Sequence, residues 1–99
     1  ILKKGVLIFM KFEWDEAKNN YNKKAHGISF ETALHVFDDP YYLEVYDFEH
    51  SDDEDRYIAL GKVGEVIFVV FTERKVRIRL ISARIATSSE RRLYYGEEI

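Results

Sequence analysis

Arginine side chains alternate with apolar residues in the segment Arg77-Ile78-Arg79-Leu80-Ile81-Ser82-Ala83-Arg84. A period of two predicts a β-strand, with Arg77 and Arg79 on one face and Arg84 on the other unless a bulge intervenes. Planar guanidinium groups on a sheet are well suited to binding phosphate groups. This strand is therefore the first candidate for a phosphate-binding surface. The sequence leaves an alternative open, an internal salt bridge from Arg79 to Glu49, Glu54 or Asp55.

The three histidines, His26, His35 and His50, do not have the spacing of metal ligands. None has a partner four residues away and no HExxH-like motif occurs, so we expect no metal site and no cofactor. His26 directly precedes a glycine expected to end a helix, where an imidazolium favours the negative helix end. His50 lies in the acidic loop 47–55, and the alternative to a chemical role is a simple solvated loop.

The net charge of −3 conceals a strong separation of charge along the chain. Residues 38–55 contain nine acidic residues and no lysine or arginine, whereas residues 72–95 have a net charge of +5 and residues 1–27 a net charge of +3. A basic segment of this kind suits a surface that binds a polyanion or docks an acidic partner. The alternative is that the acidic and basic segments face each other within the molecule.

Length and composition exclude several classes of protein. With 99 residues, 46% of them hydrophobic, the chain can form one domain with a modest core. It has no cysteine, which excludes disulfides and cysteine-ligated zinc, and its apolar runs are too short for a membrane span. We interpret Met10 as the natural start, with residues 1–9 as an upstream or added extension and residues 10–99 as one domain. No export signal is apparent, so we expect a cytoplasmic protein.

Hydrophobic periodicity predicts an α+β fold. Two N-terminal helices are expected, one from the cap Asp15 to Gly27 and one from Ser29 to a stop at residues 38–40. An antiparallel sheet of about four strands follows, and a capping box at residues 87–90 begins a C-terminal helix from about Ser88 to Tyr95. The expected strands are Tyr41–Tyr46, Arg56–Val63, Val66–Thr72 and Val76–Arg84, with Val6–Trp14 as an additional N-terminal strand.

The first of these helices has a weak apolar stripe. Ala17, Tyr21 and Ala25 fall on one side of the predicted helix, and Lys18 and Asn22 lie beside or opposite them. Because the apolar side of a surface helix usually faces the core, we expect these three residues to pack against the sheet.

Taken together, these segments resemble the BrnT family of bacterial toxins from Met10 to about Tyr95. Each motif alone is weak, but their order and spacing together are specific. The matching residues are Phe12-Glu13-Trp14-Asp15, Lys18, Asn22, His26-Gly27-Ile28-Ser29-Phe30-Glu31, Ala33, Val36-Phe37-Asp38-Asp39-Pro40, Asp47, His50-Ser51, Glu54, Arg56, Thr72-Glu73-Arg74, Ile78-Arg79-Leu80-Ile81-Ser82-Ala83-Arg84, Ala86-Thr87, Glu90-Arg91 and Tyr94.

The resemblance implies a small ribonuclease toxin with a RelE-like fold, which blocks translation by cutting RNA. It also implies neutralisation by a BrnA-like antitoxin, a ribbon-helix-helix protein through which the complex would bind operator DNA. The chain has Ala25 and Ile85 at two positions where family members usually have lysine. The alternative function is a non-catalytic binding module or co-repressor subunit that docks an acidic protein or nucleic acid through its basic face.

A metal-free ribonuclease needs a base, an acid and cations that stabilise the phosphorane. Under the resemblance, Arg79 and Arg84 are the candidates for phosphate stabilisation, and we expect Arg79→Ala to reduce toxicity more than Arg84→Ala. The base is either His50 or Glu54, and the acid either His26 or His50. Further RNA contacts are expected from the basic residues Lys18, Lys24, Arg56, Arg77 and Arg91.

Overall fold

The structure, a computed structural model, describes residues 11–97. The extension at residues 1–9, the start at Met10 and the first part of the strand predicted from Val6 lie outside these residues. No helix within the described range is long and apolar enough to cross a membrane.

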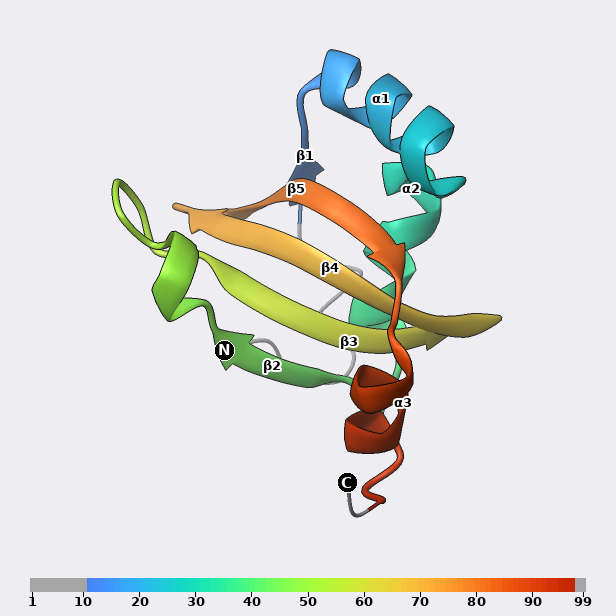
Figure 1. Cartoon of the computed structure of the whole chain (residues 1–99). Helices are drawn as coiled ribbons and strands as arrows, with labels where there is room; N and C mark the ends of the chain where they lie inside the picture. Colours follow the sequence, from blue (N-terminus) through green and yellow to red (C-terminus); the bar gives the residue numbers. More distant parts are fainter. Residues whose placement is uncertain (1–10, 98–99) are drawn as a thin grey trace.

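A five-stranded mixed sheet forms the centre of the molecule, with the strand order β1-β5-β4-β3-β2 (Figure 1). Strands β2 to β5 are antiparallel and correspond to the four strands expected from the sequence. The additional N-terminal strand, β1, pairs with β5 in parallel and makes the sheet mixed. The strands are β1 (Lys11–Glu13), β2 (Leu43–Tyr46), β3 (Tyr57–Val63), β4 (Glu65–Arg74) and β5 (Arg77–Ile85).

The N-terminal helices begin and end where the capping signals predict. Helix α1 (Glu16–His26) follows Asp15, whose carboxylate accepts hydrogen bonds from the first turn, and it ends at Gly27 in the left-handed conformation. Helix α2 (Phe30–Ala33) is capped by Ser29 and continues directly as the 3₁₀ helix η2 (Leu34–Asp38). The second predicted helix is thus present, but its second half is wound more tightly than an α-helix.

Helix α1 lies against the edge of β5, and its predicted apolar stripe is not its buried side. Ala17, Tyr21 and Ala25 are all exposed, whereas Asn19 and Asn22 are buried.

The two buried asparagines of α1 have different partners. Strand β1 pairs only with residues 77–79 of β5, which leaves backbone groups farther along this edge to be bonded by side chains. Asn22 bonds the backbone N–H and carbonyl of Ala83 there. Asn19 accepts a hydrogen bond from the N–H of Phe30 and so joins α1 to α2.

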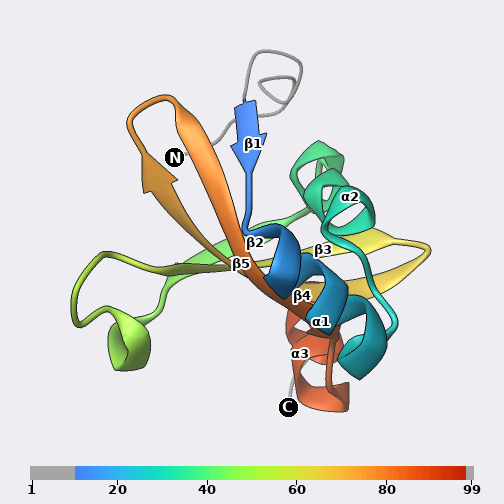
Figure 2. The same ribbon diagram turned by 90° about the horizontal axis from the view of Figure 1, so that it is seen from above.

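One face of the sheet carries the main core, covered by α2 and η2, while α1 lies along the edge of β5 (Figure 2). Gly61 on β3 permits the closest approach there, because a Cβ at this position would lie only 2.6 Å from the Cβ of Val36 on η2. The fully buried residues of this core include Phe30, Val36, Val69, Phe71, Ile78 and Leu80.

The opposite face is covered only at one end, by helix α3 (Ser88–Tyr94). Leu60, Val66 and Ala86 form a small buried cluster there, and the Tyr94 hydroxyl donates a hydrogen bond to the carboxylate of Asp39. The predicted capping box between Thr87 and Glu90 starts the helix. The loop with the 3₁₀ helix η3 (Phe48–His50) extends on the side of the molecule away from α1 and α2 (Figure 2).

Candidate functional site

A bulge in β5 brings Arg79 and Arg84 onto one face of the sheet. Leu80 pairs with Phe71 of β4, and Ser82 pairs with Val70, so that Ile81 is an extra residue without a partner in the register. The regular alternation that separates Arg79 from Arg84 is therefore broken between them. Both pair with residues whose side chains point away from the main core, so the exception that the sequence left open, a bulge, places the two arginines on the same face.

A pocket of about 630 Å³ lies on this face, beside α3 and beneath the η3 loop. The three central strands line it with the apolar side chains of Ile58, Phe68, Val70 and Ile81, and the aromatic rings of Tyr46 and Phe48 complete this apolar part. Its polar lining combines two arginines, a histidine, a serine and two carboxylates from the loop and strands: Asp47, Glu49, His50, Arg56, Ser82 and Arg84.

Asp47 orients the imidazole of His50 within this pocket. The carboxylate oxygens of Asp47 lie 3.0 and 3.1 Å from Nδ1 of His50, and Asp47 is only 8% exposed. Its backbone is fixed by the N–H bond to Arg56 and by the hydroxyl of Ser51, which donates to the Asp47 carbonyl. When Nδ1–H donates to the carboxylate, Nε2 of the neutral ring is left free to accept a proton. This geometry is that of an oriented general base.

Asp47 belongs to the acidic loop 47–55, and the sequence predicted no role for it at the site. The available signal was its spacing, since the aspartate precedes His50 by three residues and one turn of helix brings such positions together. Nine acidic residues in the same segment hid that pair, because any of several carboxylates could have been the partner of His50.

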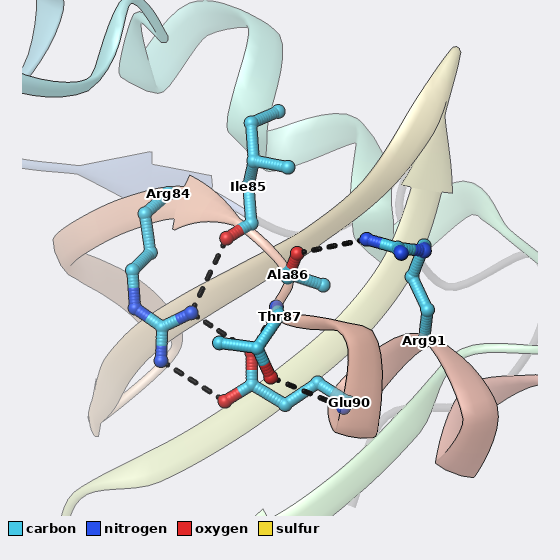
Figure 3. A network of polar contacts seen from close by, with 6 residues as sticks. All are labelled: Arg84, Ile85, Ala86, Thr87, Glu90 and Arg91. Carbon is cyan, nitrogen blue, oxygen red and sulfur yellow. Dashed lines mark hydrogen bonds and ion pairs between the residues drawn. The ribbon is translucent and has the colours of Figure 1, made fainter.

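Arg84 reaches the pocket from the end of β5 and is held there by three kinds of contact, of which Figure 3 shows the hydrogen bonds. Its Nη1 and Nη2 donate to the two carboxylate oxygens of Glu90 at 2.8 and 3.0 Å, and Nη1 also donates to the carbonyl of Ile85. The guanidinium carbon lies 3.9 Å from the ring centre of Phe68. Hydrogen bonding to Glu90 raises the pKa of Arg84 and lowers the pKa of Glu90. The result is a positioned, permanently charged group.

Arg79 does form an internal salt bridge, but its partner is Glu13 and not Glu49, Glu54 or Asp55. The Nη1 atom of Arg79 lies 3.0 Å from the Glu13 carboxylate, and Arg77 lies 3.7 Å from the same group. The parallel pairing of β1 with β5 sets Glu13 directly opposite Arg79, which explains the choice. Neither arginine lines the pocket, although both lie on its face of the sheet.

The other predicted residues divide into a neighbouring group and a distant group. Glu54 forms an ion pair with Arg74 at 3.1 Å, and with His50 and Arg56 it lines a smaller hollow of about 190 Å³ next to the pocket. Helix α1, which lies along the edge of β5, carries three of the predicted residues and contributes none to the pocket lining. The residues that do not line the pocket are Lys18, Lys24, His26, Glu54, Arg77, Arg79 and Arg91.

The separated charges of the sequence do not neutralise each other in the fold. Among the ion pairs of residues 11–97, only Arg74–Glu54 joins the acidic segment 38–55 to the basic segment 72–95. Arg79 instead pairs with Glu13 and Arg84 with Glu90, and both carboxylates lie outside the acidic segment. The pocket therefore lies between a largely exposed acidic loop and the basic strand β5, of which only Arg77 and Ile85 are exposed.

Comparison with known proteins decides which family this chain belongs to. The family of the ribonuclease toxin BrnT, of type II toxin-antitoxin systems, matches residues 14–90. The chain is a member of the BrnT family. It is also similar to the 1.1 Å crystal structure of the Brucella abortus ribonuclease toxin BrnT, with 26% identity and a TM-score of 0.54 over 80% of this chain and 99% of that chain. No curated protein matches.

Membership gives the pocket of this BrnT toxin a chemical context. A ribonuclease toxin acts on a phosphodiester backbone, and the pocket combines a histidine with two arginines. Cations and a proton acceptor are the groups that phosphodiester cleavage requires. The match also covers the whole pocket, because all twelve lining residues fall between 46 and 84.

Proposed function

We propose that this BrnT-family toxin is an endoribonuclease that cleaves RNA in the pocket of His50, Arg56 and Arg84, without a metal ion. The observation that carries the proposal is that one pocket holds both the Asp47–His50 pair and the fixed guanidinium of Arg84. Elsewhere in residues 11–97, as in this pocket, no three His, Cys, Asp or Glu side chains gather in a way that could hold a metal ion.

The reaction assigns one task to each of these side chains. Nε2 of His50 accepts the proton of a ribose 2′-hydroxyl, whose oxygen attacks the adjacent phosphorus. The bond from phosphorus to the 5′ oxygen breaks, which leaves a 2′,3′-cyclic phosphate, and water at the open pocket gives the leaving oxygen its proton. Arg84 and Arg56 stabilise the negative charge on the phosphorane. His26 has no part in this proposed reaction, because it lies at the end of α1 and does not line the pocket.

The wider biological role follows from the family. The antitoxin that we propose is a BrnA-like ribbon-helix-helix protein, with operator DNA bound only through the complex, and RNA cleavage in the cytoplasm would inhibit translation. The RelE-like character of the fold stays a prediction. Arg77 and Arg79 lie on the pocket side of the sheet and extend the path available to an RNA backbone, whereas Lys18, Lys24 and Arg91 stay predicted contacts outside the pocket.

The test is cleavage of a defined single-stranded RNA by the purified chain in the presence of EDTA. We expect product ends with a 2′,3′-cyclic phosphate, loss of cleavage in His50→Ala, and growth arrest on expression that the adjacent antitoxin gene relieves. Cleavage that requires an added divalent ion would overturn the metal-free mechanism. A folded wild-type chain that binds RNA without cutting it would favour the binding-module alternative.

A further inference from the structure

We propose that the pocket binds one nucleobase of an unpaired RNA strand and that Phe48 stacks on that base. The inference rests on the proposed ribonuclease function and deepens it, because it makes single-stranded RNA the substrate class and assigns a positioning residue. It starts from a side chain that the catalytic chemistry does not use.

Phe48 is the most exposed large apolar side chain among residues 11–97, with 84% of it open to solvent. Phe48 is the first residue of η3, between Asp47 and Glu49, and it lines the pocket together with these two residues. Its ring contacts Tyr46 edge-to-face, with ring centres 4.6 Å apart, and the Tyr46 hydroxyl donates a hydrogen bond to Asp55. The exposed ring is therefore held at the pocket by a neighbour that is itself anchored.

The interior of the pocket suits a flat group with apolar faces and a polar edge. Ile58, Phe68, Val70 and Ile81 give it an apolar lining, and Ser82 places a hydroxyl among them. The Phe68 ring already carries one planar group, the guanidinium of Arg84, on its face. A volume of about 630 Å³ is in the range of sites that bind small ligands. A base in this pocket would leave its phosphate near Arg84 and Arg56.

Binding of a base in the pocket, with Phe48 stacked on it, requires an unpaired strand. Bases in a duplex are stacked on both faces and paired at their edge, so a paired base must first be extruded at a cost in free energy. Stacking on an aromatic side chain is available to every base, and its contribution does not depend strongly on sequence. The same exposed ring could otherwise contact an apolar segment of a protein partner, but the cations beside it favour a ligand that carries phosphate.

The experiment measures binding separately from cleavage. A labelled RNA with 2′-O-methyl riboses lacks the attacking hydroxyl, so it can be titrated with the active protein. Phe48→Ala should weaken binding of this strand roughly 10-fold or more, whereas Phe48→Trp should retain it. Val76→Ala removes another exposed apolar side chain, on the turn between β4 and β5, and should bind as the wild type does. The same strand in a duplex should bind far more weakly.

The outcomes of this experiment distinguish the stacking role of Phe48 from the proposed ribonuclease function. Wild-type affinity in Phe48→Ala, or equal affinity for duplex and single strand, overturns the stacking role even if the wild type cleaves RNA. Conversely, Phe48-dependent binding by a wild-type chain that leaves ordinary RNA intact would overturn cleavage and support base binding. Loss of antitoxin binding in Phe48→Ala with unchanged RNA binding would assign the ring to a protein contact and would also overturn the inference. Thermal melts confirm that the variants are folded.

Discussion

Arg84 and Glu90 are joined by two parallel hydrogen bonds, of 2.8 and 3.0 Å, which link the end of strand β5 to the first turn of helix α3. The same carboxylate accepts a hydrogen bond from the backbone of Thr87 and so completes the capping box of that helix. One acidic side chain therefore starts α3 and fixes the direction of a pocket arginine. The position of the candidate catalytic cation depends on the folding of the C-terminal helix.

The first prediction is that Arg84→Ala reduces RNA cleavage by a factor of about 100 to 1000, the usual cost of removing one group that stabilises a developing charge. Arg84→Lys should recover only a small part of the cleavage rate, because a single ammonium nitrogen cannot reproduce the two parallel hydrogen bonds that the planar guanidinium donates to Glu90. Arg92→Ala, an exposed arginine on the same helix, is the matched control. Cleavage rates at saturating RNA provide the measurement, and an active, folded Arg84→Ala would remove Arg84 from the site.

The Arg84–Glu90 ion pair, together with Asp39, also predicts how the stability of the fold depends on pH. Hydrogen bonding to Arg84 lowers the pKa of Glu90 below its ordinary value of 4.5. Burial of Asp39 alone would raise its pKa, but hydrogen bonds from Tyr94 and two backbone N–H groups outweigh burial and lower it below 3.8. The unfolded chain therefore binds more protons in acid, and the stabilisation present above pH 4.5 is lost as the pH falls through the folded-state values.

Urea unfolding of the Glu90→Gln variant tests the prediction that stability is lost as the pH falls. Near neutral pH the variant should be less stable than the wild type, and the difference should shrink as the pH drops below 4.5. Glu97→Gln provides a control carboxylate near the same end of the chain. A difference between wild type and Glu90→Gln that does not change with pH would show that the charge of Glu90 does not contribute to folding.

The Asp47–His50 pair predicts different effects for its two members. His50→Ala removes the proposed base and should reduce cleavage by a factor of about 100 to 10,000. Asp47→Asn keeps the shape of the side chain but can donate to Nδ1, which favours the wrong tautomer of the ring, so we expect a smaller but clear loss. His35→Ala is the control, because this exposed histidine lies on η2 away from the pocket. Equal activity in Asp47→Asn and the wild type would contradict the orienting role.

The sequence predicted the order of helices and strands, because caps and periodicity are local signals. It could not predict which arginine lies in the pocket. Regular alternation places Arg79 and Arg84 on opposite faces, and the bulge at Ile81 that brings them onto one face depends on how β5 meets β4. The partner of Arg79 was likewise hidden, since Glu13 reaches it only through a parallel strand pairing 66 residues distant in sequence. Pairing between distant segments is a property of the whole fold.

These contacts reverse the expected order of the two arginines. Arg79 is 29% exposed at its side chain and lies beside Glu13, outside the pocket, so Arg79→Ala should reduce cleavage less than Arg84→Ala. Because the pair with Glu13 is partly open to solvent, its loss should cost about 1 kcal/mol of stability. Measured cleavage and urea unfolding of Arg79→Ala, Glu13→Ala and the double variant separate the two effects. A larger loss of cleavage in Arg79→Ala than in Arg84→Ala would move the site along β5.

The last prediction concerns Asn22, which bonds helix α1 to the edge of β5 where strand β1 has ended. Its Nδ2 donates to the carbonyls of Ile28 and Ala83 at 2.9 and 2.7 Å, and its Oδ1 accepts from the N–H of Ala83 at 3.2 Å. The side chain is only 3% exposed, so water cannot replace these bonds freely. Asn22→Ala leaves buried backbone groups without partners and should lower the free energy of unfolding by about 3 kcal/mol.

Asn22→Asp is the sharper test of the same contact. It preserves the shape of the side chain but directs a carboxylate oxygen at two carbonyl oxygens in a buried site, so we expect it to destabilise the fold at least as much as alanine does near neutral pH. Acid should relieve part of this loss, because a protonated carboxyl can donate to one of the carbonyls. The exposed neighbour Asn20→Ala should be nearly neutral. Urea unfolding provides the comparison, and a neutral Asn22→Ala would show that apolar packing alone holds α1 on the sheet.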